Sequence, residues 1–542
     1  MLSRFYRNTL KRIPGMDGSR IMRPVKFVYH RYHYPPAVPI PTPTEELAQD
    51  LIQPESVQGD VLFQAPTLDS ARLAALAWFV KQLGLAVTQQ QLLQVFEEQM
   101  SPLDWKNLLA LLDWSIQNSE SNQRHPRRGS VVRVTNLKDS GMPQRRRNIL
   151  FVTGEFPNPI HGGGGRVFDF IQIMGQAHNI YLYTWFVAAT DANVFERLKP
   201  YCAAIDKVSF LEFEHSGERL AQFVANVPID IVHYEWPRSL TNFDASLGEL
   251  QIFSYMECTS LRLLMDLRLK DLNSPAWAHK AIDVFNALKV ELVDAAQMNA
   301  RVVVTQKDGE FLARFAPQET FLVLHHGVNF DEFCIPDQEP EDHLLVFVGN
   351  FLHYPNVDGA QFFFSKVFDL IQAQVPDVRV LLAGANPTPE IMAYQDDRHV
   401  FVTGTVDDIR PYIQKASVCI APLITGAGLR SKVIQYAALK RVCVATSIAA
   451  TDLLFEDGKD IFIADDPDLF AQRIIYLLQH PDAARRMAES AYEKARFHYD
   501  NRKLVQELYG VYANLERANI AQVPVQGARE KGDSKSGGCP TN

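Results

Sequence analysis

The stretch "SVCIAPLITGAGLRSKVIQYAALKRVCVATS", residues 417–447, carries the pattern that decides the fold. "SVCIAP" and "VCVAT" are short apolar strands, and a glycine-containing loop and an amphipathic helix lie between them. This order is typical of the βαβ unit of a parallel sheet. Gly426 and Gly428 allow a close backbone approach, and Arg430 and Lys432 stand at the predicted helix start, where cations oppose the helix dipole. We interpret the loop as an anion site; the alternative is a helix start with two exposed basic residues.

The same alternation of strands and helices occurs twice along the chain. A first series begins with "NILFVTG" at Asn148 and includes "NIYLYTW" and "IDIVHYE". "PDQEPED" interrupts it, and a second series begins with "HLLVFVG". The pattern predicts an α/β fold with two Rossmann-like doubly wound domains, at 148–337 and 342–500. A helical segment at 501–518 is expected to cross back to the first domain.

The flanking segments have a different texture. Helical periodicity with a C-cap at Gly84 and an N-cap at Ser101 predicts a small helical module. Four segments are expected outside the two domains. They are an irregular basic and proline-rich segment at 1–60, the helical module at 61–120, a polar linker at 121–147 and a disordered tail at 519–542.

Composition excludes several classes of protein. The formal charge of −9 over 542 residues argues against nucleic-acid binding. The six cysteines lack CxxC spacing, which predicts reduced thiols and no zinc site. With no signal peptide and no apolar run of about 18 residues, we expect a cytoplasmic protein. The basic start, "MLSRFYRNTLKRIPG", is either a frayed tail or an amphipathic segment making peripheral contact with the cytoplasmic face of a membrane.

Two features of the first series are candidates for chemistry. Gly162–Gly165 precede Arg166 and a predicted helix, which suits a second anion site, although a flexible turn is the alternative. His233 and Glu235 in "IDIVHYEW" and Glu257 in "QIFSYMECTS" are expected near the rim of the first sheet. Two anion sites facing one cleft suit a diphosphate, and more specifically a nucleotide-sugar.

These motifs resemble the GT-B glycosyltransferases of group 1, also called family 4, over about residues 148–515. The resemblance rests on "LLVFVGNFLHYPNVDGAQFF", on "VFVTGTVDDIRPYIQKASVCIAPLITGAGLRSKVIQYAAL" and on "LVLHHGVNFDEF". It implies a retaining transferase that uses a nucleotide-sugar as substrate, with no metal and no cofactor. The implied donor-binding residues are Gly164, Gly165, Asn356, Thr405, Val406, Gly426, Gly428, Arg430, Lys432 and Gln435.

The chain departs from the family pattern at several positions. Gln435 stands where the family has an acid that bonds the donor ribose, Glu257 where a histidine is common, and Lys440 where a glycine is usual. We expect a transferase that moves a sugar from a UDP- or GDP-linked donor to a carbohydrate or lipid-linked acceptor. His233 and Glu257 are the catalytic candidates. The alternatives are a nucleotide-sugar epimerase of the same fold and a catalytically impaired nucleotide-sugar binding protein.

Overall fold

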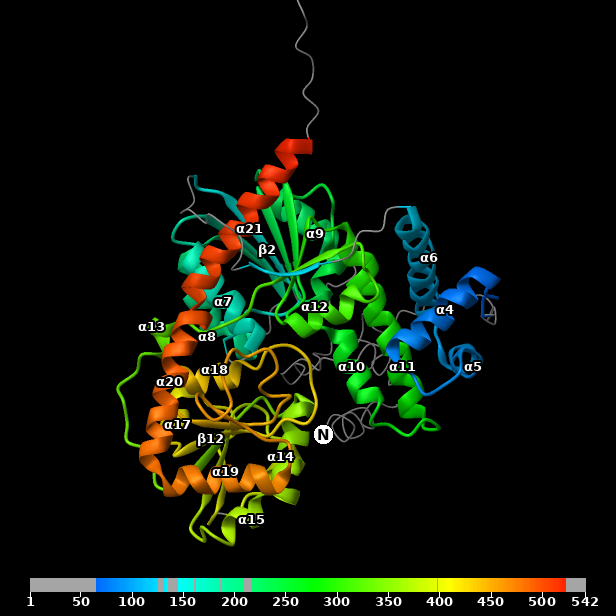
Figure 1. Cartoon of the computed structure of the whole chain (residues 1–542). Helices are drawn as coiled ribbons and strands as arrows, with labels where there is room; N and C mark the ends of the chain where they lie inside the picture. Colours follow the sequence, from blue (N-terminus) through cyan, green and yellow to red (C-terminus); the bar gives the residue numbers. More distant parts are fainter. Residues whose placement is uncertain are drawn as a thin grey trace, which may run out of the picture.

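The chain folds around two parallel sheets that form separate lobes (Figure 1). The N-terminal segment predicted at 1–60 and most of the predicted tail lie outside the described residues. This computed structural model describes residues 65–124, 130–134, 145–159, 162–185, 188–208, 216–396 and 398–522.

The first sheet has eight strands in its described part, all parallel, in the order β1-β8-β7-β6-β5-β2-β3-β4. Its central strand β2 is buried on both faces, as expected of an apolar run in a parallel sheet. The strands are β1 (Ser130–Arg133), β2 (Asn148–Thr153), β3 (Asn179–Trp185), β4 (Cys202–Val208), β5 (Ile231–Glu235), β6 (Leu250–Ser254), β7 (Ala300–Val303) and β8 (Thr320–Val323). Helices α7 (Gly162–Met174), α8 (Ala188–Leu198), α9 (Ser216–Val224), α10 (Thr259–Leu267), α11 (Pro275–Leu288) and α12 (Gln306–Ala313) belong to this lobe.

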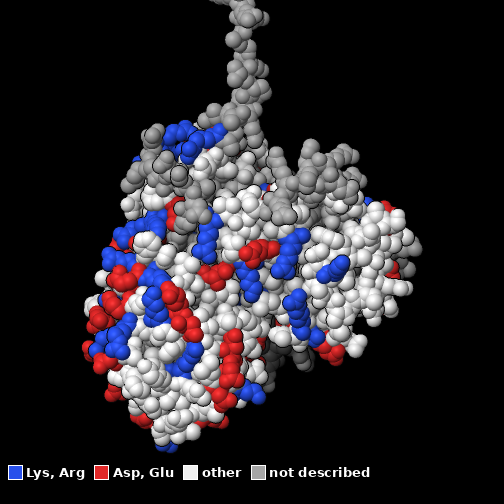
Figure 2. Space-filling model, viewed as in Figure 1, with Lys and Arg blue, Asp and Glu red and all other residues white. Residues whose placement is uncertain are grey.

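The second sheet is also parallel, in the order β11-β10-β9-β12-β13-β14. Its strands are β9 (Leu344–Val348), β10 (Arg379–Ala383), β11 (Val400–Val402), β12 (Val418–Ala421), β13 (Cys443–Ala445) and β14 (Phe462–Ile463). Its helices are α14 (Tyr354–Lys366), α15 (Phe368–Gln372), α16 (Pro389–Met392), α17 (Arg410–Gln414), α18 (Ser431–Ala438), α19 (Pro467–Gln479) and α20 (Pro481–Tyr499). The prediction of two Rossmann-like domains is confirmed. Figure 2 shows acidic and basic side chains interspersed on the visible face of this lobe.

Three helices precede the first sheet: α4 (Ser70–Leu83), α5 (Gln89–Gln99) and α6 (Pro102–Arg124). They pack on α11 and on the segment after α12 through aromatic rings, with the Phe79 and Phe315 centroids 5.5 Å apart and those of Phe96 and Phe285 5.2 Å apart. The side-chain amide of Asn286 donates to Asp104 at 2.9 Å. Their core is therefore continuous with that of the first domain.

Two local features differ from the sequence-based expectation. Residues 130–133, expected in a linker, form the edge strand β1, because Val131 and Val132 pair with β8 beside α12. The four glycines, expected before a helix, form the first turn of α7 itself. The surrounding basic and polar residues hid the first of these elements, and the low helix propensity of glycine hid the second.

Two chain segments connect the domains, and they lie against each other. The first, around Val328, continues into the short helix α13 (Phe330–Phe333), and the second joins α20 to α21 (Asn501–Gln522). The N–H of Val328 donates to the carbonyl of Tyr499 at 2.9 Å. A Cβ on Gly327 would lie 1.8 Å from that same oxygen, so only glycine fits there. Helix α21 then runs back along α7 and contributes to the first domain's core (Figure 1).

The shared core makes a testable prediction for Phe79→Ala. Removing a fully buried ring should lower the free energy of unfolding of the first domain by about 3–5 kcal/mol. Urea unfolding followed by tryptophan fluorescence measures it, since Trp105 and Trp277 report on the helices and the domain. Leu103→Ala, at a side chain 42% exposed, is the control and should change little. An unchanged first-domain midpoint in Phe79→Ala would show that the helices are an independent unit.

Candidate functional site

A cleft with a cavity volume of about 610 Å³ lies between the two domains. Its walls are formed beyond the carboxyl ends of strands from both sheets, where ligands bind in open parallel sheets. Gly163, Gly164 and Gly165 line one wall, and the segment 427–432 lines the other. The expected placement of the two loops across one cleft is confirmed.

The first wall is the N-terminus of α7, which we name the glycine turn (Gly162–Gly165). A Cβ on Gly164 would lie 2.3 Å from the carbonyl oxygen of Asn158, so a side chain there would displace the preceding loop. The first N–H groups of a helix have no intrahelical acceptor, and the dipole of this 13-residue helix favours negative charge at that end. The turn therefore has the chemistry of an anion site.

The second wall is the loop before α18, which reaches across to the first domain. Gly428 has a φ of 76°, and a Cβ on it would lie 3.1 Å from the Cβ of Glu257. His326, in the segment between the domains, donates through Nε2 to the carbonyl of Leu429 at 3.0 Å. These contacts fix the loop that carries the two basic side chains.

Arg430 precedes α18 directly and is partly buried at the cleft. Its guanidinium donates to the carbonyl of Ala427, while its Nε is buried without a partner in the described part of the chain. Burial lowers the pKa of Arg430, and the charges of Glu257 and Asp308 oppose that shift. A guanidinium held this way can still donate to an anion in the cleft.

Lys432 lies in the first turn of α18, with its Nζ 4.4 Å from the ring centroid of Phe347. Nζ donates to Oδ1 of Asn356 at 2.6 Å, and the amide of Asn356 donates to the carbonyl of Asn350 at 2.8 Å. Burial, and then the charge of Arg430, lowers the pKa of Lys432 to about 7. A bound anion would favour the charged amine and reverse this shift.

Glu257 is the carboxylate on the first-domain side of the cleft. Its Oε1 accepts from Nε of Arg262 at 2.8 Å, which holds the carboxylate of Glu257 next to the second wall.

Two further titratable groups lie near Glu257. Glu291, in the π-helical turn Lys289–Asp294, accepts from the N–H of Thr259 at 2.5 Å and so fixes the start of α10. Across the cleft, burial lowers the pKa of His353 to about 4, so this imidazole is neutral at pH 7.

The expected position of His233 is wrong. This side chain lies within β5, 1% exposed, and does not line the cleft. Its Nε2 is 2.5 Å from the hydroxyl of Tyr512, and its ring stacks on Phe151 with centroids 5.0 Å apart. Glu235, 3.5 Å from its Nδ1, is buried with it. Helix α21 covers this end of the strand, and the local sequence carries no signal of that.

Most of the other predicted site residues do line the cleft. Gly426 does not; its φ of 119° places it against the guanidinium of Arg430. The predicted residues at the cleft are Gly164, Gly165, Glu257, Asn356, Thr405, Val406, Gly428, Arg430, Lys432 and Gln435. Lining residues that sequence reasoning missed include Asp169, Arg197, His326, His353, Asn386 and Arg410. His326, His353 and Asn386 follow the strands β8, β9 and β10, which is the only signal the sequence offers, and the other three lie within helices.

Two absences concern the described residues only. No group of three or more His, Cys, Asp or Glu side chains converges there as metal ligands. Within the same part of the chain, no helix combines the length and apolar character that a bilayer crossing needs.

Residues 342–480 match a family model described as glycosyl transferases group 1. A curated relative, an uncharacterized 44.6 kDa protein in the cps region of Klebsiella pneumoniae, is 25% identical over 192 residues. That alignment covers 34% of this chain and 48% of the relative, so it spans about half of the relative's length. The resemblance to group 1 glycosyltransferases is confirmed by the family match.

Solved structures establish the GT-B fold. Sucrose-phosphate synthase from Thermosynechococcus elongatus has a TM-score of 0.54 at 16% identity, covering 69% of this chain and 100% of that one. HepE from Anabaena, in complex with UDP and glucose, has a TM-score of 0.51 at 12% identity and covers 68% of this chain and 100% of its own. TarM from S. aureus, in a complex that includes UDP, has a TM-score of 0.51 at 10% identity, covering 68% and 99%.

The buried amine of Lys432 makes the affinity for a diphosphate dependent on pH. With a free-state pKa of about 7, the amine is mostly neutral above that pH, so binding an anion must take up a proton. Affinity for UDP should be level just below pH 7 and fall as pH rises, by up to about tenfold per unit. Calorimetry from about pH 7.5 to about pH 9, where phosphates are fully ionised, measures this in two buffers of different ionisation enthalpy.

Lys432→Arg is the control for this prediction, because a guanidinium stays charged throughout that range. Proton uptake should disappear in this variant and the pH dependence should flatten. Equal pH dependence in both proteins would show that another group takes up the proton.

Proposed function

We propose that this protein is a retaining glycosyltransferase that moves a sugar from a nucleotide-sugar donor to an acceptor hydroxyl. The observation that carries the proposal is the pair of anion-binding walls on one cleft: the glycine turn on one side, and Arg430 and Lys432 on the other. A diphosphate presents negative charge to both sides at once. The group 1 family match over 342–480 covers the basic wall.

In this proposal the cleft stabilises the leaving group. Arg430 and Lys432 donate to the diphosphate as the bond between the sugar and its phosphate breaks, and the N–H groups of the glycine turn face it from the other domain. Both contributions gain strength where water is excluded. They offset the leaving-group charge without a metal ion or other cofactor.

We assign each of the remaining cleft residues to one part of the donor: the base, the diphosphate or the sugar. Thr405 and Val406, after β11, are assigned to the base, and Asn356 to the diphosphate through its bond to Lys432. Gln435 is assigned to sugar hydroxyls, to which an amide can both donate and accept. Glu257 faces the transferred sugar or the acceptor, and we assign no protein nucleophile.

We propose a UDP-linked hexose as the donor, with a GDP-linked one as the alternative. HepE was solved with UDP-glucose as well as with UDP, which makes UDP the first nucleotide to test. The acceptor we propose is a carbohydrate, free or lipid-linked. A TarM structure contains UDP together with a glycosylated glycerol, which is one pattern for such an acceptor.

The direct test is to incubate the protein with UDP-glucose or a GDP-hexose, with and without carbohydrate acceptors, and to follow nucleoside diphosphate release by mass spectrometry. Release that depends on an acceptor supports the transferase. Conversion of the donor sugar without an acceptor would identify an epimerase. Tight binding of UDP without turnover would identify a binding protein, an outcome that Gln435, an amide where the family pattern has an acid, makes worth measuring.

Lys432→Ala should weaken UDP binding by about tenfold to a hundredfold, because it removes a charge-assisted hydrogen bond of roughly 1.5–3 kcal/mol. Affinity for uridine should hardly change, since uridine has no phosphate. Lys440→Ala is the matched control, because this exposed lysine pairs with Glu489 at 3.0 Å on the surface. Equal UDP affinity in wild type and Lys432→Ala would remove the phosphate assignment.

Gln435→Glu tests the sugar end of the site. A carboxylate there accepts hydrogen bonds from hydroxyls more strongly than an amide does. We expect a larger change in donor turnover than in UDP affinity, measured by initial rates and calorimetry on one preparation. A change in UDP affinity that exceeds the change in turnover would place Gln435 at the phosphates instead.

A further inference from the structure

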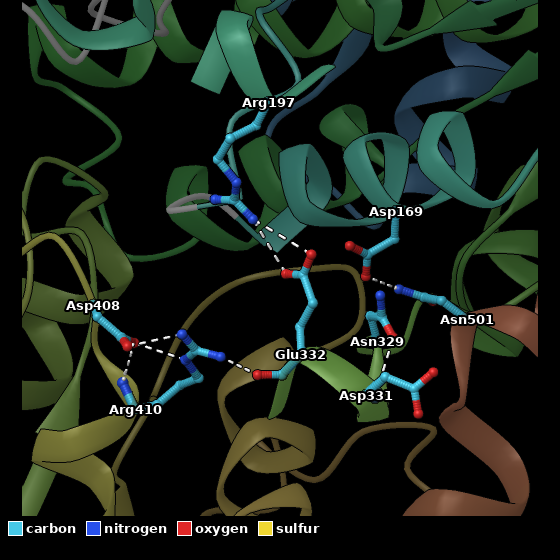
Figure 3. Close-up of polar contacts among 8 residues, drawn as sticks. All are labelled: Asp169, Arg197, Asn329, Asp331, Glu332, Asp408, Arg410 and Asn501. Carbon is cyan, nitrogen blue, oxygen red and sulfur yellow. Dashed lines mark hydrogen bonds and ion pairs between the residues drawn. The ribbon is translucent and has the colours of Figure 1, made fainter. Parts of the chain in front are cut away.

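Asp169 is a buried carboxyl group that the proposed chemistry does not use. It lies on α7, one turn beyond the glycine turn, and is 7% exposed at the edge of the cleft. Its Oδ2 accepts from the side-chain amide of Asn501 at 2.5 Å (Figure 3). Burial raises the pKa of Asp169 to about 7, and the hydrogen bonds from Asn501 and from the backbone N–H of Asn329 oppose that shift. Both partners lie on the connections between the two domains.

Asn501 joins these connections to each other. Its backbone N–H donates to the carbonyl of Val328 at 3.1 Å, and its Oδ1 accepts from the N–H of Gly327 at 3.1 Å. The side chain is fully buried, and its two polar atoms are both used. One amide group therefore ties α7 to both chain segments that connect the domains.

A second link lies beside this one. Arg197, on α8, pairs with the carboxylate of Glu332 at 3.3 Å, and Arg410, on α17, donates to the backbone carbonyl of Glu332 (Figure 3). Arg197 and Glu332 are half-exposed, and exposed pairs of this kind contribute about 0–1 kcal/mol. The buried contact between Asp169 and Asn501 is therefore the one that can fix the position of α7.

We propose that Asp169 and Asn501 form a clasp that fixes the glycine turn to the pivot between the domains, so that domain closure brings the turn onto the donor diphosphate. This inference rests on the proposed function, because it assigns the clasp a role in donor turnover. Both are positioning residues: they set where the N–H groups of α7 lie and do not touch the donor. Arg430 and Lys432 hold the diphosphate from the other domain independently of the clasp.

The test is an exchange of the two side chains. Asp169→Asn replaces the carboxylate, which accepts from Asn501 and from the N–H of Asn329, by an amide with a single oxygen, and its new NH2 group cannot accept from either donor. In Asn501→Asp, two carboxylates face each other. In the double variant Asp169→Asn/Asn501→Asp, the new amide donates to the new carboxylate, which still accepts from the N–H of Gly327. Every hydrogen bond of the clasp is then restored at unchanged net charge.

We expect each single variant to turn the donor over about tenfold more slowly, with UDP affinity within about threefold of wild type. The double variant should recover to within about threefold. Asp331→Asn is the matched control, since this exposed residue of the same connection pairs with Arg502 at 2.7 Å away from the cleft. A double variant as slow as the single ones, or single variants as fast as wild type, would overturn the clasp.

Hydrogen exchange of the free protein separates this inference from the proposed function. Amides of residues 162–174 should exchange faster in Asp169→Asn and return to wild-type rates in the double variant, whether or not any donor is turned over. Unchanged exchange would overturn the clasp, whereas failure of wild type to bind UDP would overturn the proposed function. If Asp169→Asn does not fold, Asp169→Glu, which keeps the charge and shifts it by one methylene group, should also exchange these amides faster than wild type, and unchanged exchange there would overturn the clasp.

Discussion

The cleft is organised by the burial of two cations on one short stretch of chain. Arg430 and Lys432 stand at the start of a helix, where the dipole disfavours positive charge, and both are partly buried, which lowers the pKa of each. Their neighbours offset only part of the cost of placing two positive charges there. Lys432 has an amide and an aromatic ring as neighbours, and burial raises the pKa of Asp308, the acid behind Arg430, to about 7. An anion between the walls removes the remaining cost.

The glycines act at points where two backbones must come close. Gly164 allows the start of α7 to pass under Asn158, and Gly428 allows the loop before α18 to touch Glu257. The second contact brings an acid from one domain next to the cations of the other. Acid and cations belong to different domains, so the packing of the two domains sets their spacing.

The two chain segments that connect the domains are held together by close packing and hydrogen bonds. Gly327 has no room for a side chain beside Tyr499, and Asn501 uses its whole amide on backbone and carboxyl partners. Helix α21 follows the second of these segments and packs on the first domain, where the hydroxyl of Tyr512 forms a hydrogen bond with His233. The helices α4–α6 extend a second core cluster of the first domain through Phe79 and Phe96.

The sequence by itself determined the two parallel sheets and the two glycine-containing turns that face the cleft. Apolar strands, helix signals and glycine-basic loops are local features, because neighbouring residues set backbone conformation and strand burial. Tertiary structure alone decided which side chains share a site. His233 became a core residue because Tyr512, 279 positions away, covers it, and Asp169 meets Asn501 across 332 positions. Such contacts depend on how a distant helix packs, and no periodicity near either residue encodes that.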